Sequence, residues 1–305
     1  MTTALSAPTT AAKLASRLKG KDPKTAEVTK PKILIYGAPG VGKTFTSLDW
    51  PSVYYIDTEG GANLPHYTDK LKAAGGAYLG PEDGANDFET IIAQMQALAS
   101  EEHGYRTLVI DSITKPFVSA ITAEAERLGD KDAFGASKKP AIALTRRVID
   151  WLDRLPMNVI IIAHERPEWG IDAKGERAQV GITYDAYEKL AYELHLVLHV
   201  QKRGRDRVAI VKKSRLTGFP EGETIPWTFN EIAARYGRDV IEKKQAALVL
   251  ATPEQVRKLQ KLIQAVKVEE EVLAKWRTKA RVENWSEMTA AQIEPCIAHL
   301  EGKLA

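Results

Sequence analysis

A glycine-rich segment near the start of the chain has the residue types needed to bind phosphate groups. Glycines permit a tight turn whose backbone N–H groups face phosphate oxygens, and a following helix adds the partial positive charge of its N-terminus. In such loops a lysine reaches the β- and γ-phosphates, and a threonine hydroxyl ligates Mg²⁺. We therefore expect a binding site for ATP and Mg²⁺ formed by Gly37, Ala38, Pro39, Gly40, Val41, Gly42, Lys43 and Thr44.

The elements on both sides of this segment are of the kind that would position it. The apolar run 33–36 predicts a buried strand before the loop, and a helix is expected over 44–49. Further apolar runs alternate with helical stretches, which predicts an α/β fold with a mainly parallel central sheet flanked by helices. Strands 193–201 and 207–213, joined by a turn containing Gly204, would close the sheet as a hairpin. The other predicted strands are 53–56, 107–110 and 159–163, and the other predicted helices are 87–100 and 141–155.

Two carboxylates follow predicted strands and could complete a hydrolytic site. Asp111 comes directly after the strand 107–110 and suits a Mg²⁺ ligand, although an aspartate there can also cap the next turn. The next residue is Ser112, at a position where many P-loop motors carry the glutamate that activates water. A glutamate must then come from elsewhere, and Glu59 follows the strand 53–56.

The phosphate loop, the run Asp57-Thr58-Glu59 and the pair Asp111-Ser112 together resemble the RecA/recombinase superfamily of P-loop ATPases. The resemblance implies a RecA-like core in which Glu59 orients and deprotonates the attacking water, while Asp111 holds Mg²⁺. The alternative interpretation is that Asp57 and Glu59 are ordinary loop carboxylates.

Three later residues fit the same superfamily. His164 follows the strand 159–163, where these ATPases place a polar residue, often glutamine, that senses the γ-phosphate. Histidine departs from that pattern, so a structural role stays open. Lys213 and Arg215 match a basic pair that reaches the ATP of the neighbouring subunit, which implies an oligomer, either a ring or a filament. The alternative for this pair is an exposed basic strand end.

Two long polar segments, 128–140 and 165–187, occupy the places where RecA-like proteins keep their DNA-binding loops. Long loops inside a compact domain are usually functional or disordered. Basic side chains interleaved with aromatic rings suit single-stranded DNA, because cations bind phosphates and rings stack on bases. Acidic residues in the second segment weaken this electrostatic argument. The candidate DNA-binding residues are Lys131, Phe134, Lys138, Lys139, Arg166, Trp169, Lys174 and Arg177.

The flanks of the chain differ from its centre. Residues 1–30 are predicted to be a flexible basic arm, and residues 31–245 the RecA-like ATPase core. Residues 252–305 are predicted to be a small helical module, because capping patterns at Thr252 and Thr289 precede apolar residues at helical spacing. Pro295 is expected to delay or kink the last helix.

Composition restricts the setting in which the chain works. The net charge of +3 in 305 residues is too small to argue for nucleic acid by itself. Cys296 is the only cysteine, which excludes an internal disulfide and favours a reducing cytoplasm. No apolar run approaches the roughly 18–20 residues needed to span a bilayer, and the first residues lack the apolar stretch of a secretory signal. We therefore expect a cytoplasmic location and no membrane contact.

Residues 32–227 resemble, within the superfamily, the RecA-core branch of the Sak single-strand annealing proteins of phages. This resemblance implies ATP-dependent binding of single-stranded DNA and strand annealing or pairing in recombination, within the cytoplasm of a phage host. The helical module is similar to modules of other phage recombination proteins, which implies contact with DNA or with a single-strand-binding protein. Two alternatives stay open: a helicase- or translocase-type motor, and a nucleotide-binding regulatory protein without DNA contact.

Overall fold

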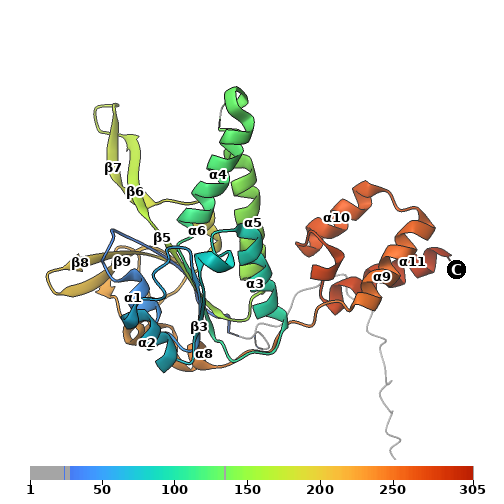
Figure 1. Cartoon of the computed structure of the whole chain (residues 1–305), viewed down its shortest axis with the longest axis horizontal. Helices are drawn as coiled ribbons and strands as arrows, with labels where there is room; N and C mark the ends of the chain where they lie inside the picture. The colour runs from blue at the N-terminus through green and yellow to red at the C-terminus, as the bar shows by residue number, and fades with distance from the viewer. Residues whose placement is uncertain (1–23, 25–27, 134, 305) are drawn as a thin grey trace, which may run out of the picture.

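A computed structural model describes Lys24 and residues 28–133 and 135–304. Its centre is an eight-stranded sheet with the strand order β10-β9-β8-β1-β5-β4-β2-β3, and β6 and β7 form a separate two-stranded sheet (Figure 1). The elements up to the end of this α/β part are β1 (Lys32–Tyr36), α1 (Lys43–Ser47), β2 (Val53–Asp57), α2 (Pro65–Ala73), β3 (Ala77–Leu79), η2 (Pro81–Asp83), α3 (Phe88–Ser100), β4 (Thr107–Asp111), α4 (Thr114–Leu128), η3 (Gly129–Lys131), α5 (Lys138–Arg154), β5 (Asn158–Ala163), β6 (Glu165–Ile171), β7 (Arg177–Tyr184), α6 (Leu190–Glu193), β8 (Leu196–Arg203), β9 (Asp206–Ser214), β10 (Thr224–Pro226), α7 (Phe229–Tyr236) and α8 (Arg238–Glu242). The remaining elements are α9 (Pro253–Val266), α10 (Glu270–Ala280), η4 (Trp285–Glu287) and α11 (Ala290–Leu304).

The central sheet is mainly parallel, as predicted. Strands β3, β2, β4, β5, β1 and β8 pair in parallel, whereas β9 pairs antiparallel with both β8 and β10 at one side of the sheet. The four apolar runs and the β8–β9 hairpin read from the sequence are all strands of this sheet. The predicted fold class, an α/β core plus C-terminal helices, is therefore confirmed.

The strands are apolar throughout because both faces of the sheet are covered. Side chains alternate between the faces of a strand, so Leu34 and Ile161 pack on one side while Ile33 and Ile160 pack on the other. Helices α3, α4 and α5 contribute to the first core, and α7 and α8 contribute to the second. Two separate cores thus pack the sheet between layers of helices.

One edge of the sheet collects the residues that follow β1, β2, β4 and β5. The strands are parallel, and their register pairs Tyr36 with Ala163 and Asp57 with Asp111. The segments immediately after them must therefore emerge side by side. This edge is where the phosphate loop and the predicted carboxylates are positioned.

Two projections extend beyond this edge and point in the same direction (Figure 1). Helices α4 and α5 pack together as a helical hairpin, and β6 and β7 form the second projection. The prediction of long loops over 128–140 and 165–187 is therefore wrong. The first segment is partly helical, since α5 begins at Lys138, and the second is mostly a β-hairpin with a turn near Gly175.

The C-terminal helices have a hydrophobic core of their own. Leu259 of α9 packs with Ile293 and Leu300 of α11 in a cluster separate from the two cores of the sheet. The capping box predicted at Thr252 is present, with Gln255 bonding back to the backbone of Thr252. This core supports the predicted division of the chain near residue 252, which remains a proposal.

Pro295 does not delay the start of α11, which begins at Ala290 and contains the proline. The predicted N-terminal arm falls almost wholly outside the described residues. Lys30, which the prediction assigned to the arm, is instead buried, and its Nζ donates to the carbonyl of Ile241 at 3.2 Å.

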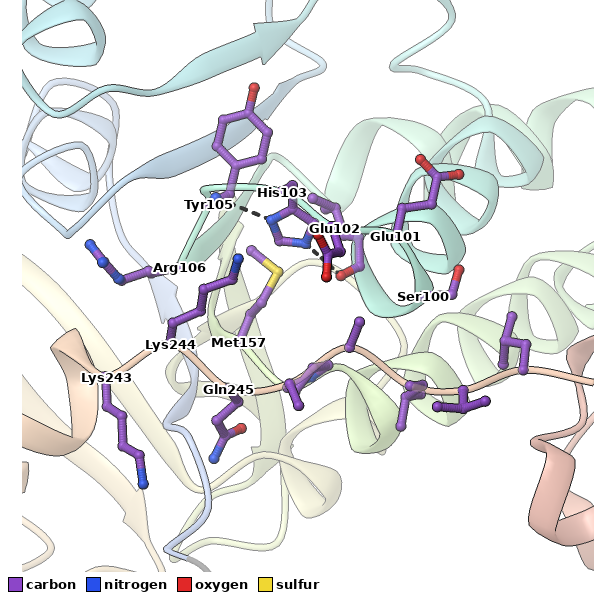
Figure 2. Close-up of a pocket in the computed structure, with 17 residues that line it drawn as sticks. Ser100, Glu101, Glu102, His103, Tyr105, Arg106, Met157, Lys243, Lys244 and Gln245 are labelled. Carbon is purple, nitrogen blue, oxygen red and sulfur yellow. Dashed lines mark hydrogen bonds between the residues drawn. The ribbon is translucent and has the colours of Figure 1, made fainter.

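The segment 243–250 connects the sheet to the C-terminal helices and crosses the far end of the core. The backbone N–H of Leu248 donates to the carbonyl of Ala99 at 2.7 Å. A cavity of about 690 Å³ lies beneath the segment and is lined by His103, Arg106 and Lys244, among others (Figure 2). Among the described residues, no helix is long and apolar enough to cross a membrane.

Candidate active site

The phosphate loop links β1 to α1 through a backbone path that requires glycine. Gly40 and Gly42 have φ angles of 75° and 91°, which other residues adopt at a cost. A Cβ on Gly37 would lie 2.2 Å from the carbonyl oxygen of Val200. The Nζ of Lys43 lies inside the loop and donates to the carbonyls of Gly37 and Ala38 at 2.7 and 2.9 Å. The lysine is therefore already positioned over the loop that would hold the phosphates.

Thr44 and Asp111 provide the oxygen atoms suited to a divalent cation. The Thr44 hydroxyl donates a hydrogen bond to Oδ2 of Asp111, and the Tyr55 hydroxyl donates to the same oxygen at 3.3 Å. Burial raises the pKa of Asp111 to about 6, although the Thr44 bond acts in the opposite direction. Hydroxyl and carboxylate oxygens are the ligands that Mg²⁺ takes together with phosphates and water. The pair fits Mg²⁺ that arrives with a nucleotide.

Asp57 is buried and binds the backbone of the turn that follows β2. It is 1% exposed, and its Oδ1 accepts from the backbone N–H groups of Glu59 and Gly60 at 2.9 and 3.0 Å. Its Oδ2 accepts from the N–H of Ala62 at 2.6 Å. Both oxygens are used to shape the turn after β2, so the loop-carboxylate interpretation holds for Asp57.

Glu59, in contrast, points its carboxylate toward side chains from two other strand ends. Its Oε1 accepts from the Ser112 hydroxyl at 2.6 Å and lies 2.9 Å from Nε2 of His164. Its Oε2 forms an ion pair with Lys115 at 3.3 Å. Burial acts to raise the pKa of Glu59, but Ser112, His164 and Lys115 together lower it below its ordinary value. Glu59 is therefore an ionised carboxylate at the mouth of the site.

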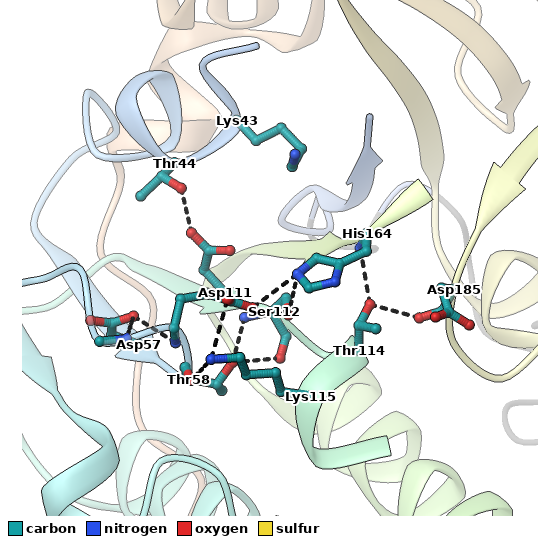
Figure 3. A network of polar contacts seen from close by, with 12 residues as sticks. Lys43, Thr44, Asp57, Thr58, Asp111, Ser112, Thr114, Lys115, His164 and Asp185 are labelled. Atoms are coloured by element: carbon teal, nitrogen blue, oxygen red, sulfur yellow. Dashed lines mark hydrogen bonds and ion pairs between the residues drawn. The ribbon is translucent and has the colours of Figure 1, made fainter. Parts of the chain in front are cut away.

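His164 is fixed by its backbone as well as by its ring. Its N–H donates to the Thr114 hydroxyl at 2.9 Å, and that hydroxyl donates to the carbonyl of Asp185 at 2.7 Å (Figure 3). The imidazole is 47% exposed and bridges Glu59 and Ser112. The ring therefore lines the same cavity as Lys43 and Thr44 of the phosphate loop.

Sequence reasoning missed Lys115, which lies in the first turn of α4. Because the sequence did not predict this helix, it gave no reason to place the Lys115 side chain near Glu59. A proline in the helical turn after Asp111, at position 116, is the signal that could have placed a helix start there.

Most of the predicted nucleotide-binding residues, although not Ala38, Val41 or Gly42, line one cavity of about 590 Å³ together with the predicted carboxylates. Two aromatic residues that sequence reasoning did not select, Tyr55 and Tyr67, also line it, together with Gly60, Gly61, Leu64 and Glu165. The predicted residues that line it are Gly37, Pro39, Gly40, Lys43, Thr44, Glu59, Asp111 and His164.

Lys213 and Arg215 lie at the opposite end of the strands from the phosphate loop. Ser214 pairs with Leu196, which itself pairs with Ile33 at the start of β1, whereas the phosphate loop follows the end of β1. The two side chains donate to the carbonyls of Leu194 and Tyr192. They therefore do not reach the phosphate loop of their own chain.

The predicted DNA-binding residues divide between the two projections. The guanidinium of Arg166 donates a hydrogen bond to the carbonyl of Tyr184 and lies 3.9 and 3.7 Å from the carboxylates of Asp185 and Glu188. These carboxylates partly neutralise its charge. The guanidinium of Arg177 lies 5.6 Å from the centre of the Trp169 ring. Phe134 lies outside the described residues. The exposed candidates are Lys131, Lys138 and Lys139 at the tip of the helical hairpin and Trp169, Lys174 and Arg177 on the β-hairpin.

Comparisons with known proteins give a matching family and similar solved structures. The crystal structure of the RadB recombinase is similar at a TM-score of 0.41 and 21% identity, covering 64% of this chain and 86% of that chain. No curated protein matches the chain. Residues 29–219 match the family described as AAA domain, which supports nucleotide binding and ATP hydrolysis. Since this match spans more than half of the 305 residues, the chain belongs to the AAA domain family.

Proposed function

We propose that the chain is an ATP-hydrolysing protein that binds single-stranded DNA and promotes strand annealing or pairing in phage recombination. The position of the two projections supports this proposal most. Both projections with exposed cations originate at the edge of the sheet that carries Glu59, so one end of the molecule combines a hydrolytic site with a surface suited to a nucleic acid.

The residues around the phosphate loop account for hydrolysis. Lys43 would exchange the carbonyls of Gly37 and Ala38 for the β- and γ-phosphates, and Thr44 with Asp111 would hold Mg²⁺, which neutralises phosphate charge. Glu59 would orient the attacking water and accept its proton. His164, beside Glu59, would sense whether the γ-phosphate is present.

The projections account for DNA binding. Lys131, Lys138 and Lys139 place three cations at the tip of one projection, where phosphates of a single strand could bind. Trp169 is 55% exposed on the other projection and offers a ring on which a base could stack. A strand spanning both tips would lie above the catalytic edge.

We further propose that the working unit is a ring or filament of identical subunits. Lys213 and Arg215 are remote from the phosphate loop of their own chain, so a neighbouring subunit is the place where they could contact ATP. The helical module over 252–305 is proposed to contact DNA or a single-strand-binding protein, and the cytoplasm is the proposed location.

Turnover of ATP measured with and without oligo-dT tests the proposal, together with annealing of complementary fluorescent strands. We expect turnover to rise with oligo-dT and annealing to require the protein. An absence of DNA binding at low salt would favour a nucleotide-binding regulatory protein. Directional unwinding of a duplex, coupled to turnover, would favour a helicase or translocase instead.

A further inference from the structure

Lys115 connects Glu59 to the helix that carries one of the projections. Its Nζ lies 3.3 Å from Oε2 of Glu59 and donates to the carbonyl of Thr58 at 3.1 Å. The lysine belongs to the first turn of α4, and the same helix ends at Leu128, at the tip with the exposed lysines. A displacement of α4 would therefore move the cation next to Glu59.

The second projection is tied to the same point. The Thr114 hydroxyl, one residue before Lys115, accepts from the N–H of His164 and donates to the carbonyl of Asp185. The N–H of Asp185 donates to the carbonyl of His164 at 2.8 Å. His164 and Asp185 directly flank the β-hairpin, so both of its ends are joined to the start of α4 (Figure 3).

The contacts of Glu59 describe a restrained carboxylate. Oε1 is occupied by Ser112 and His164, and Oε2 faces Lys115. A carboxylate paired with a cation is a weaker base than a free one, because the cation stabilises its ionised form. In this arrangement the Glu59 carboxylate is less able to accept a proton from water.

We propose that Lys115 is a positioning residue that restrains Glu59 and releases it when single-stranded DNA occupies the two projections. The DNA-dependent half of this inference rests on the function proposed above. The restraint itself rests only on the contacts of Lys115. Lys115 and Glu59 have side chains that are 42% and 33% exposed, so the pair is partly screened by solvent. The expected effect on turnover is therefore modest, about two- to fivefold.

Steady-state turnover of Lys115→Met and of Lys115→Arg tests the proposal, with Lys72→Met as a matched control at an exposed lysine of α2. Lys115→Met should raise DNA-free kcat about two- to fivefold, leave KM for ATP unchanged, and lower the stimulation by oligo-dT by the same factor. Lys115→Arg keeps the cation and should retain most of the stimulation. Thermal unfolding of each variant checks that α4 remains folded.

The Glu59→Gln background separates restraint from a general structural role. If Lys115 acts through the carboxylate, adding Lys115→Met to Glu59→Gln should not change the residual turnover. An unchanged or lower DNA-free kcat in Lys115→Met, or an equal rise in the Glu59→Gln background, would overturn the restraint. Failure of the parental protein to bind oligo-dT would instead refute the proposed function and the release by DNA, while the DNA-free comparison still decides the restraint.

Discussion

The hydroxyl of Ser112 donates a 2.6 Å hydrogen bond to Oε1 of Glu59, although the two residues follow different strands. The pairing of Asp57 with Asp111 aligns β2 and β4, so the turns after them meet. Ser112 occupies a position where many P-loop motors have a glutamate. Here Glu59, from the neighbouring strand end, accepts a hydrogen bond from that serine.

Replacing Glu59 with Gln should separate ATP binding from chemistry. The variant keeps the shape of the side chain but loses the base, so turnover should fall by about a hundredfold or more while ATP affinity is retained. Single-turnover hydrolysis and binding of a fluorescent ATP analogue measure the two effects. Parental turnover in Glu59→Gln would remove Glu59 from catalysis. Asp57 is not a ready substitute, because both of its oxygens accept backbone N–H groups.

Replacing Trp169 with Ala should weaken binding of oligo-dT by roughly 1–3 kcal/mol if a base stacks on the ring. Arg166→Ala is the informative comparison, because Arg166 already lies near Asp185 and Glu188 and should contribute less. Fluorescence anisotropy at several salt concentrations measures both, and affinity should fall as salt rises. Equal affinities for the parent, Trp169→Ala and the tip variants Lys138→Ala and Lys139→Ala would refute the two-projection site.

The strands and the catalytic edge were predictable because their signals are local. A run such as 159–163, apolar on every residue, is what a strand covered on both faces requires. Polar residues after parallel strands must meet at one edge, so Glu59, Asp111 and His164 could be grouped from the sequence.

Helix α4 and the β6–β7 hairpin were not predictable in the same way because most of their surface is exposed. In α4 the buried residues are confined to Thr114, Pro116 and Phe117, so the apolar periodicity of a helix is weak. In β7 the alternation of Val180, Ile182 and Tyr184 was a strand signal, but it is surrounded by polar residues. Missing α4 also meant missing the contact of Lys115 with Glu59.

Lys32 should make stability depend on pH. Its Nζ donates to the carbonyls of Leu155 and Met157 at 2.7 Å each, and burial lowers the pKa of Lys32 from 10.5 to about 7. Between these two values the unfolded chain binds one proton more than the folded chain, so this residue makes stability rise with pH across that window. Below about pH 7 both states are protonated and the dependence ends.

Replacing Lys32 with Met removes this dependence while keeping a side chain of similar length. Urea unfolding at pH 7.5 and pH 9 should show the free energy of unfolding of the parent gaining roughly 2 kcal/mol relative to Lys32→Met over that range. Lys30, whose pKa is lowered to about 8 chiefly by burial, is present in both proteins and largely cancels in the comparison. Parallel pH profiles for the two proteins would show that Lys32 is charged in the folded state.

Mixing two inactive variants should test whether Arg215 acts across a subunit interface. Lys43→Ala loses the phosphate-directed cation, whereas Arg215→Ala keeps a sound phosphate loop and should still bind ATP as an isolated subunit. Each variant alone should hydrolyse ATP poorly, because every interface then lacks one of the two groups. Arg215 lies at the opposite end of the strands from its own phosphate loop, so the two defects are on different surfaces.

A mixed assembly contains some interfaces that join an intact loop from one variant to an intact Arg215 from the other. With random assortment at equal proportions, each of the two requirements is met half of the time, so activity should return to at most about a quarter of the parental value. ATPase measurements over a titration of one variant into the other would show a maximum near equal proportions. Size-exclusion chromatography with light scattering must first show that the variants assemble together. If they do and no activity returns, Arg215 acts within its own subunit or serves another purpose, because interfaces that join an intact loop to an intact Arg215 would then be present without effect.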